Sequence, residues 1–221
     1  MKVLSIISQK GGVGKTTIAT ALAVAADKDG KQVALFDLDD QASACFWSDI
    51  REAPTPAIKD VKAVRLTNYL GSMREAGCYL VIIDCPPVHK DIALDAAAPA
   101  DFVLIPTKPD LFDIRSMQMT VNLLSKINKP SAVILTFCPP SGPEVPGARD
   151  AVSQIGAALC PIELGLRKSY ARAQQTGLTA QEFEPEGKAA QEIAELYEYT
   201  CIHLYKNEAD HEEKQPIASR A

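Results

Sequence analysis

A short glycine-rich segment near the N-terminus constrains the fold more than any other feature of this 221-residue sequence. The segment reads QKGGVGKTT over residues 9–17. It follows an apolar, β-branched run at residues 3–8 and opens an alanine-rich stretch with helical periodicity at residues 16–28. A glycine loop between a strand and a helix is typical of a phosphate-binding loop. The chain is therefore expected to begin with a β-strand, an anion-binding turn and an α-helix.

The middle of this segment is suited to holding an anion. Gly11, Gly12, Val13 and Gly14 form a backbone with little steric restriction, so successive N–H groups can turn toward one point. The N-terminus of the following helix adds a partial positive charge at the same place. These four residues are predicted to bind the phosphates of a nucleotide.

The side chains that follow match a nucleoside triphosphate bound with Mg²⁺. Lys15 is predicted to reach the β- and γ-phosphates, Thr16 to ligate Mg²⁺, and Thr17 to contact the α-phosphate. The usual pattern GxxxxGK[ST] is not met, because Gln9 occupies its first glycine position. A lysine, Lys10, instead precedes the glycine pair.

Two further apolar runs end in carboxylates. Residues 33–37 lead into a DxDxQ segment that contains Asp39, and residues 79–84 end in Asp84. The second pattern is typical of a Walker B strand, whose aspartate holds Mg²⁺ directly or through water. Asp84 is therefore predicted to lie at the metal.

Together these segments make the chain resemble the ParA/MinD family of ATPases, because a glycine loop led by a lysine is the deviant Walker A motif. The resemblance covers about residues 1–205 and is strongest in the first half of the chain. It implies ATP and Mg²⁺ as cofactors and slow, regulatory hydrolysis of ATP. It also implies an ATP-dependent homodimer in which Lys10 reaches the nucleotide of the partner subunit. The length is that of the short ParA type.

The resemblance assigns roles to further residues. Asp39 would orient the attacking water and contact Mg²⁺ through water, so Lys10, Lys15 and Asp39 form the predicted catalytic set. Pro106 and Thr107, which end another apolar run, would lie near the base and ribose of the nucleotide. The family often has proline where this chain has Asp40, so the geometry next to Asp39 is expected to differ slightly.

Apolar runs alternate with helical patterns along the whole chain. Strands are predicted at residues 3–8, 33–37, 79–84, 102–106 and 132–137, and helices at residues 16–28, 67–76, 114–127, 148–159 and 186–205. Continuous apolar strands between helices indicate a parallel sheet covered on both faces. The predicted fold class is α/β, with one doubly wound, mostly parallel sheet of the P-loop NTPase type.

Proline-rich segments and the C-terminus complete the predicted organisation. Residues 53–60 and 138–147 contain several prolines and are predicted to be irregular. Residues 1–205 are expected to form one ATPase domain. Residues 206–221 are polar with mixed charge and are expected to be a disordered tail.

The net charge of −5 means that any contact with DNA must come from a local basic patch. Arg167, Lys168 and Arg172 form such a cluster with no acidic residue among residues 165–172. Short ParA proteins bind double-stranded DNA without sequence preference through basic residues in their C-terminal half. The resemblance therefore implies DNA binding through this cluster, nucleoid association in the ATP state, and a ParB-like or other adaptor protein as a partner.

The remaining observations bear on localisation and on other functions. The six cysteines form no CxxC pair, which favours reduced thiols in a cytoplasmic protein. Residues 206–216 are acidic and lack large apolar side chains, so no membrane contact is expected. Three alternatives stay open: a dethiobiotin-synthetase-like ligase, a MinD-like positioning ATPase, and an iron–sulfur ATPase that would use Cys85. The cargo also stays open among a plasmid, a chromosome region, a transfer complex and a protein body.

Overall fold

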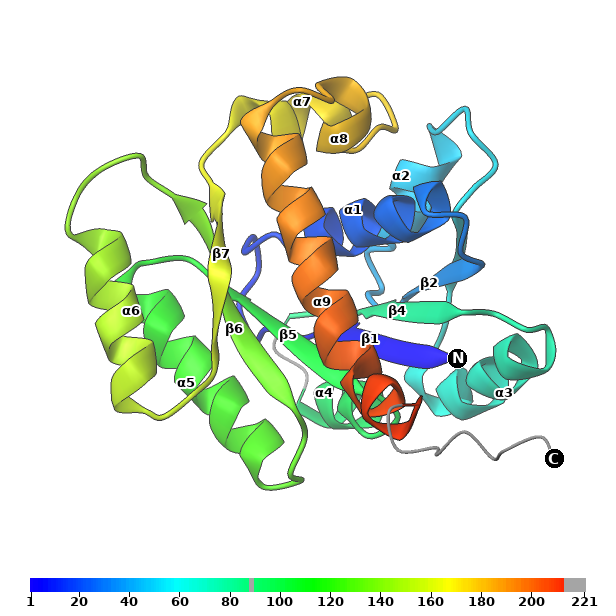
Figure 1. Cartoon of the computed structure of the whole chain (residues 1–221), viewed down its shortest axis with the longest axis horizontal. Helices are drawn as coiled ribbons and strands as arrows, with labels where there is room; N and C mark the ends of the chain where they lie inside the picture. Colours follow the sequence, from blue (N-terminus) through cyan, green and yellow to red (C-terminus); the bar gives the residue numbers. More distant parts are fainter. Residues whose placement is uncertain (88–89, 213–221) are drawn as a thin grey trace, which may run out of the picture.

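The computed structural model describes residues 1–87 and 90–212 of the chain. Within them, seven strands form one sheet in the order β3-β2-β4-β1-β5-β6-β7 (Figure 1). Every neighbouring pair is parallel. The strands are β1 Lys2–Ile6, β2 Val33–Asp37, β3 Ala57–Asp60, β4 Leu80–Asp84, β5 Phe102–Thr107, β6 Ser131–Cys138 and β7 Leu159–Gly165. The predicted fold class, a doubly wound parallel sheet of the P-loop NTPase type, is confirmed.

Helices connect these strands. They are α1 Lys15–Lys28, α2 Ser43–Asp49, η1 Ala63–Arg65, α3 Leu66–Glu75, α4 Lys90–Ala97, α5 Leu111–Ser125, α6 Glu144–Gln154, α7 Lys168–Gln174, α8 Ala180–Phe183 and α9 Lys188–Glu212. No helix among the described residues is long and apolar enough to cross a membrane.

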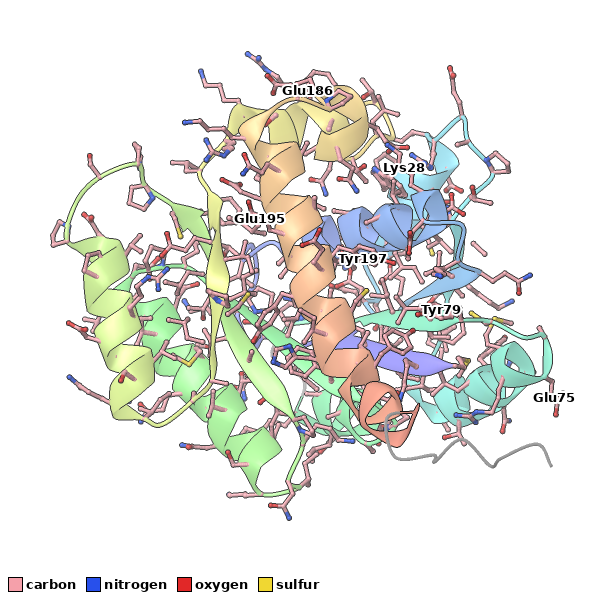
Figure 2. All side chains as sticks on the ribbon, viewed as in Figure 1. Lys28, Glu75, Tyr79, Glu186, Glu195 and Tyr197 are labelled. Carbon is pink, nitrogen blue, oxygen red and sulfur yellow. The ribbon has the colours of Figure 1, made fainter. Side chains whose placement is uncertain are left out.

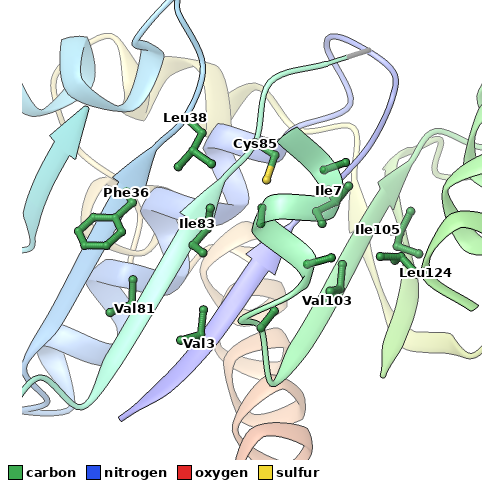
Figure 3. Packing of buried hydrophobic residues seen from close by; sticks show 14 of the residues in the cluster. Val3, Ile7, Phe36, Leu38, Val81, Ile83, Cys85, Val103, Ile105 and Leu124 are labelled. Atoms are coloured by element: carbon green, nitrogen blue, oxygen red, sulfur yellow. The ribbon is translucent and has the colours of Figure 1, made fainter. Parts of the chain in front are cut away.

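The sheet is covered on both faces because successive strand residues point to opposite sides. In β1, Val3 packs in a cluster with side chains of α3, α4, α5 and α6, and Figure 3 shows this cluster from close by. Its neighbour Leu4 packs on the other face against α1 and α9. Both side chains are at most 2% exposed. The fully apolar strands of the sequence therefore contribute side chains to two hydrophobic cores, one on each face of the sheet.

Two segments that the prolines suggested were irregular contain regular structure. Residues 57–60 form the edge strand β3, with Ala57 opposite Ala34 of β2. An edge position tolerates prolines just before it, because only one side of the strand needs ladder hydrogen bonds. Helix α6 begins at Glu144, inside the second segment and earlier than predicted. Both predictions of irregular structure are wrong over these residues.

The C-terminal helix α9 crosses the sheet on the same face as α1 (Figure 1). Tyr197, labelled in Figure 2, lies beside α1 and donates a 3.3 Å hydrogen bond to Asp29. The helix continues to Glu212 and so includes residues 206–212 of the predicted tail. These residues contain neither glycine nor proline, so nothing in their sequence stops the helix. Residues 213–221, the rest of the predicted tail, lie outside the described residues.

Candidate nucleotide-binding site

The phosphate loop leaves the C-terminal end of β1 and turns directly into α1. Gly12 and Gly14 have φ angles of +69° and +90°, which L residues with a side chain rarely adopt. Gly14 stands at the N-cap of α1, where no side chain caps the helix, and the first turn holds no acidic residue. The first N–H groups of α1 are therefore available to an anion, together with the positive end of the helix dipole.

Lys15 lies folded into its own loop. Its ammonium donates a 2.9 Å hydrogen bond to the carbonyl oxygen of Lys10, and the residue is 7% exposed. Burial lowers the pKa of Lys15, while the nearby carboxylates of Asp84 and Asp39 act in the opposite direction. A buried ammonium held by one neutral carbonyl is poorly satisfied, and an incoming phosphate would supply the missing negative charge.

Asp84 ends β4 directly beneath the start of α1. The hydroxyl of Thr16 donates a 2.6 Å hydrogen bond to one carboxylate oxygen of Asp84. The other oxygen, Oδ1, is buried without a hydrogen-bond partner. Burial raises the pKa of Asp84 to about 7, with a further contribution from the nearby Asp37. An orphaned carboxylate oxygen beside a threonine hydroxyl fits a hard divalent cation such as Mg²⁺.

The site contains few protein ligands for such a cation. Among the described residues, no group of three or more His, Cys, Asp or Glu side chains could hold a metal ion. Mg²⁺ commonly takes one or two protein oxygens and completes its shell with water and substrate phosphates. Thr16 and Asp84 would therefore hold it only when a nucleotide supplies the remaining oxygens.

The two aspartates at the end of β2 do different things. Asp37 is fully buried and accepts hydrogen bonds from the backbone N–H groups of Ala44, Cys45 and Asp39, so it caps helix α2. Burial raises the pKa of Asp37, against the effect of these hydrogen bonds. Asp39 is partly exposed and lines the cleft next to the phosphate loop. Of the two, only Asp39 lines the cleft.

Asp40, the departure from the family pattern, faces elsewhere. Its carboxylate forms a 2.6 Å ion pair with Lys62, and both side chains are well exposed. Asp40 is not among the residues that line the cleft. Asp40, which replaces the proline common in the family, therefore lies at the surface, while Asp39 lines the cleft next to the phosphate loop.

Lys10 turns away from the cleft formed by its own loop. Its ammonium lies 3.9 Å from a carboxylate oxygen of Asp113 on α5, and its side chain is 42% exposed. A pair at this distance and exposure contributes at most about 1 kcal/mol. Lys10 is thus weakly held and close to solvent. Its predicted reach to a partner subunit stays a prediction.

A cleft of about 740 Å³ opens over the phosphate loop. Its remaining walls come from other parts of the chain: Ser43, Phe46, Trp47 and Ile50 of the α2 region, Pro87, Phe137, and Ala171, Gln174 and Gln175 of the α7 region. A smaller pocket of about 110 Å³ adjoins it and shares Gly14, Thr17, Phe137, Ala171 and Gln174 with the cleft. The sequence carried no signal for these wall residues, because they meet only through the fold.

Pro106 and Thr107, predicted to lie near the base and ribose, are buried in β5. Neither is among the residues that line the cleft or the smaller pocket. The carbonyl oxygen of Thr107 accepts a 3.2 Å hydrogen bond from Thr136 on β6, and the same hydroxyl lies 3.0 Å from the carbonyl oxygen of Val13. The side chain of Thr136 therefore lies between the backbones of Thr107 and Val13 of the phosphate loop. A direct contact with the nucleotide stays a prediction.

The basic cluster near residue 170 is only partly free. Arg167 donates a 2.7 Å hydrogen bond to Glu192 of α9, whose carboxylate also accepts one from Tyr170. Lys168 and Arg172 are exposed and line a groove of about 420 Å³ that also includes Lys188 at the start of α9. The local sequence contains no acid, but the fold brings Glu192 to Arg167. The groove is therefore basic chiefly through Lys168, Arg172 and Lys188, although Glu184 adds one acidic side chain to its lining.

Cys85 follows Asp84 and is 1% exposed (Figure 3). Burial raises the pKa of its thiol, and the neighbouring Asp84 adds to that effect. A buried thiol of this kind behaves as a small apolar side chain.

Comparison with known proteins identifies the class to which this site belongs. Residues 4–180 match the family model described as the CobQ/CobB/MinD/ParA nucleotide-binding domain. The match spans well over half of the chain, so the chain belongs to this family of P-loop proteins. Within it the chain is of the ParA/MinD type, whose members are ATPases.

Individual relatives narrow the comparison. A protein of Gloeobacter kilaueensis named maintenance of carboxysome distribution protein A is 32% identical, over 92% of this chain and 94% of its own. Protein ParA of Rhizobium radiobacter is 27% identical, over 80% and 84% respectively. The septum site-determining protein MinD of Pyrococcus horikoshii, solved with Mg-ADP, superposes with a TM-score of 0.70 at 20% identity, covering 90% of this chain and 95% of its own. That last likeness shows the fold.

Proposed function

We propose that this ATPase is a dimeric switch that positions an intracellular cargo on DNA, with slow hydrolysis that a partner protein stimulates. The observation that carries the proposal is a complete phosphate loop whose extra lysine, Lys10, points out of its own cleft. The names of two relatives, one concerned with carboxysome distribution and one a ParA protein, support a positioning role over a metabolic one.

Phosphoryl transfer to water needs charge neutralisation and an in-line water. Lys15 and the N–H groups at the start of α1 would bind the phosphates, with Thr17 at the α-phosphate. Thr16 and Asp84 would hold Mg²⁺, which neutralises charge on the phosphate oxygens when it is bound. Asp39, partly exposed at the cleft, would accept a hydrogen bond from the water that attacks the γ-phosphorus. ADP and phosphate would leave, and the contacts that depend on the γ-phosphate would be lost.

Lys10 supplies the link between ATP and assembly. Its pair with Asp113 is weak enough to be exchanged for the phosphates of a nucleotide held by a second subunit. Two subunits would then bind each other through their nucleotides, and hydrolysis would release them. We expect Lys10→Ala to bind ATP with wild-type affinity and to remain monomeric. Light scattering in Mg-ATP tests this, and a mutant that dimerises like wild type would contradict the cross-subunit role.

DNA binding would follow from dimerisation. The net charge of −5 opposes binding by a monomer, whose groove offers about three cations. A dimer would present two grooves on one body, so about six phosphate contacts would act together. About six contacts imply a loss of affinity of roughly a thousandfold between about 50 and 200 mM salt.

The test is fluorescence anisotropy with two unrelated DNA duplexes, with Mg-ATP or Mg-ADP, across a salt series. We expect salt-sensitive binding of both duplexes in Mg-ATP only. Lys168→Glu with Arg172→Glu should remove it, whereas charge reversal at Arg167 would also break the pair with Glu192. Binding in Mg-ADP equal to that in Mg-ATP, or absence of binding to either duplex, would exclude this form of the switch.

A further inference from the structure

Helix α7 presents its residues to two different sites. Ala171 and Gln174 line the nucleotide cleft. Lys168 and Arg172, on the same seven-residue helix, line the basic groove. A ligand that changes the contacts of Gln174 in the cleft therefore acts on the helix that carries Lys168 and Arg172 of the groove.

One side-chain hydrogen bond joins α7 to the phosphate loop region. The Nε2 amide of Gln174 donates to the hydroxyl oxygen of Thr17 at 3.0 Å, across 157 residues of sequence. A threonine hydroxyl has one donor and two acceptor positions, so Thr17 can donate to a phosphate oxygen and still accept from Gln174. Such a chain of hydrogen bonds is cooperative, because a hydroxyl that donates to an anion becomes a better acceptor.

The two ends of α7 are held differently. At its start, Arg167 and Tyr170 both donate hydrogen bonds to Glu192 of α9. None of these three residues lines the nucleotide cleft. At its end, the backbone hydrogen bonds from Gln175 and Gly177 are 3.3 Å long, whereas those from Thr176 and Leu178 to the carbonyl of Ala173 are 3.0 Å. The end of α7 is the end that touches the phosphate loop region, through the hydrogen bond from Gln174 to Thr17.

We infer that Gln174 is a positioning residue that makes the order of α7 depend on the bound nucleotide. A phosphate at Thr17 strengthens the Gln174–Thr17 hydrogen bond, which fixes the end of α7 and with it Arg172. The inference rests on the proposed function, since it requires a nucleotide at the phosphate loop. It adds a route by which nucleotide binding affects the basic groove within one subunit, before any dimer forms.

The chain contains a matched control for this contact. Gln181 on α8 donates a 2.7 Å hydrogen bond to the carbonyl oxygen of Ala21, one helical turn along α1 from Thr17. It links the same two parts of the molecule with the same side chain. Gln181 is not among the residues that line the cleft. Loss of this bond should weaken packing without altering the response to a nucleotide.

The experiment is hydrogen exchange of the backbone amides of residues 171–178, measured with and without Mg-ADP. Calorimetry on the same samples reports whether Mg-ADP is bound. The full chain is used as wild type, Gln174→Leu, Gln174→Glu and Gln181→Leu. The glutamate variant keeps the size of the side chain and cannot donate to Thr17, so it replaces the leucine variant if that one misfolds.

In wild type and Gln181→Leu, saturating Mg-ADP should slow exchange of these amides about tenfold, the equivalent of one strengthened hydrogen bond. In Gln174→Leu and Gln174→Glu the slowing should be absent at the same saturation. Equal slowing in all four proteins would overturn the inference, and so would no slowing in a wild type that binds Mg-ADP. Absence of Mg-ADP binding by calorimetry would overturn the proposed function, and this inference with it.

Discussion

The phosphate loop and the cap over the cleft, which we define as α7, α8 and the loop between them (residues 168–183), are built in opposite ways. The loop is a single short segment with a local contact from Lys15 to the carbonyl of Lys10, and Thr136 supports it through one distant hydrogen bond to Val13. The cap is held by distant contacts: Trp47 donates to Leu178 at a separation of 131 residues, and Gln174 to Thr17 at 157. The first kind of structure is visible in a short sequence motif, and the second exists only after folding.

This contrast predicts that substitutions in the loop change chemistry, while substitutions beneath the cap change stability or coupling. The largest effect belongs to the loop. Lys15→Ala should abolish detectable ATP binding, because the phosphates lose their main counter-charge in a poorly solvated site. Calorimetry with Mg-ATP measures it, with circular dichroism to show that the fold is kept. Retained affinity would remove the phosphate-loop assignment.

Asp39→Ala should leave ATP binding and dimerisation in place and slow hydrolysis by about 10²- to 10⁴-fold, the usual loss when a positioned acid–base group is removed. Phosphate release under saturating Mg-ATP is the measurement. Asp40→Ala is the matched control, because its carboxylate is committed to Lys62 at the surface. If Asp40→Ala were the slow variant, the two roles would have to be exchanged.

Beneath the cap, Arg51→Ala should cost up to about 3 kcal/mol of the free energy of unfolding, because it leaves the half-buried carboxylate of Glu182 without its cation and with hydrogen bonds from Thr179 alone. The guanidinium makes two hydrogen bonds to Glu182, at 2.7 and 2.9 Å, and one to the carbonyl of Gly177. Urea unfolding in the absence of nucleotide measures the loss. A change in the free energy of unfolding below about 0.5 kcal/mol, as expected for an exposed pair, would show that Arg51 does not hold the cap.

The same pair should give the cap a dependence on pH. Burial alone would raise the pKa of Glu182, but hydrogen bonds from Arg51 and Thr179 outweigh it and the pKa is lowered on folding. The stabilisation is therefore present above the unfolded pKa and is lost as the pH falls through the lower, folded value. Arg51→Ala should reduce the loss of the free energy of unfolding at acidic pH. If the loss is unchanged in this variant, it arises from other carboxylates.

The smallest effect is expected at the groove. Lys168→Ala should weaken DNA binding uniformly across sequences and reduce the salt slope by about one for each copy of the groove. Anisotropy titrations of two duplexes at several salt concentrations measure both quantities. A loss confined to one duplex would indicate base contact in place of phosphate contact.

The sequence predicted the elements whose causes are local. The apolar strands, the glycine loop, and the proximity of Thr16 to Asp84 all follow from short patterns, and the last was found as a 2.6 Å hydrogen bond. It could not predict β3, because the prolines of residues 53–60 favoured a loop. Proline is excluded from central strands but is tolerated at an edge strand such as β3. It also missed Phe137 and Gln174, since no periodicity marks a residue that closes a cleft 120 residues or more from the loop. The pair between Arg167 and Glu192 could not be predicted either, because the two residues are 25 positions apart in the sequence.

Trp47 has a practical consequence. It is the single tryptophan of the chain, it lines the nucleotide cleft, and its indole N–H donates to Leu178 in the cap. The guanidinium of Arg51 lies 4.9 Å from its ring centre. Tryptophan emission responds to the polarity and charge around the indole, so the unlabelled protein carries its own optical reporter at the junction of cleft and cap. Its fluorescence should register nucleotide entry, and polarised emission should register any loosening of the cap, in one cuvette without a dye.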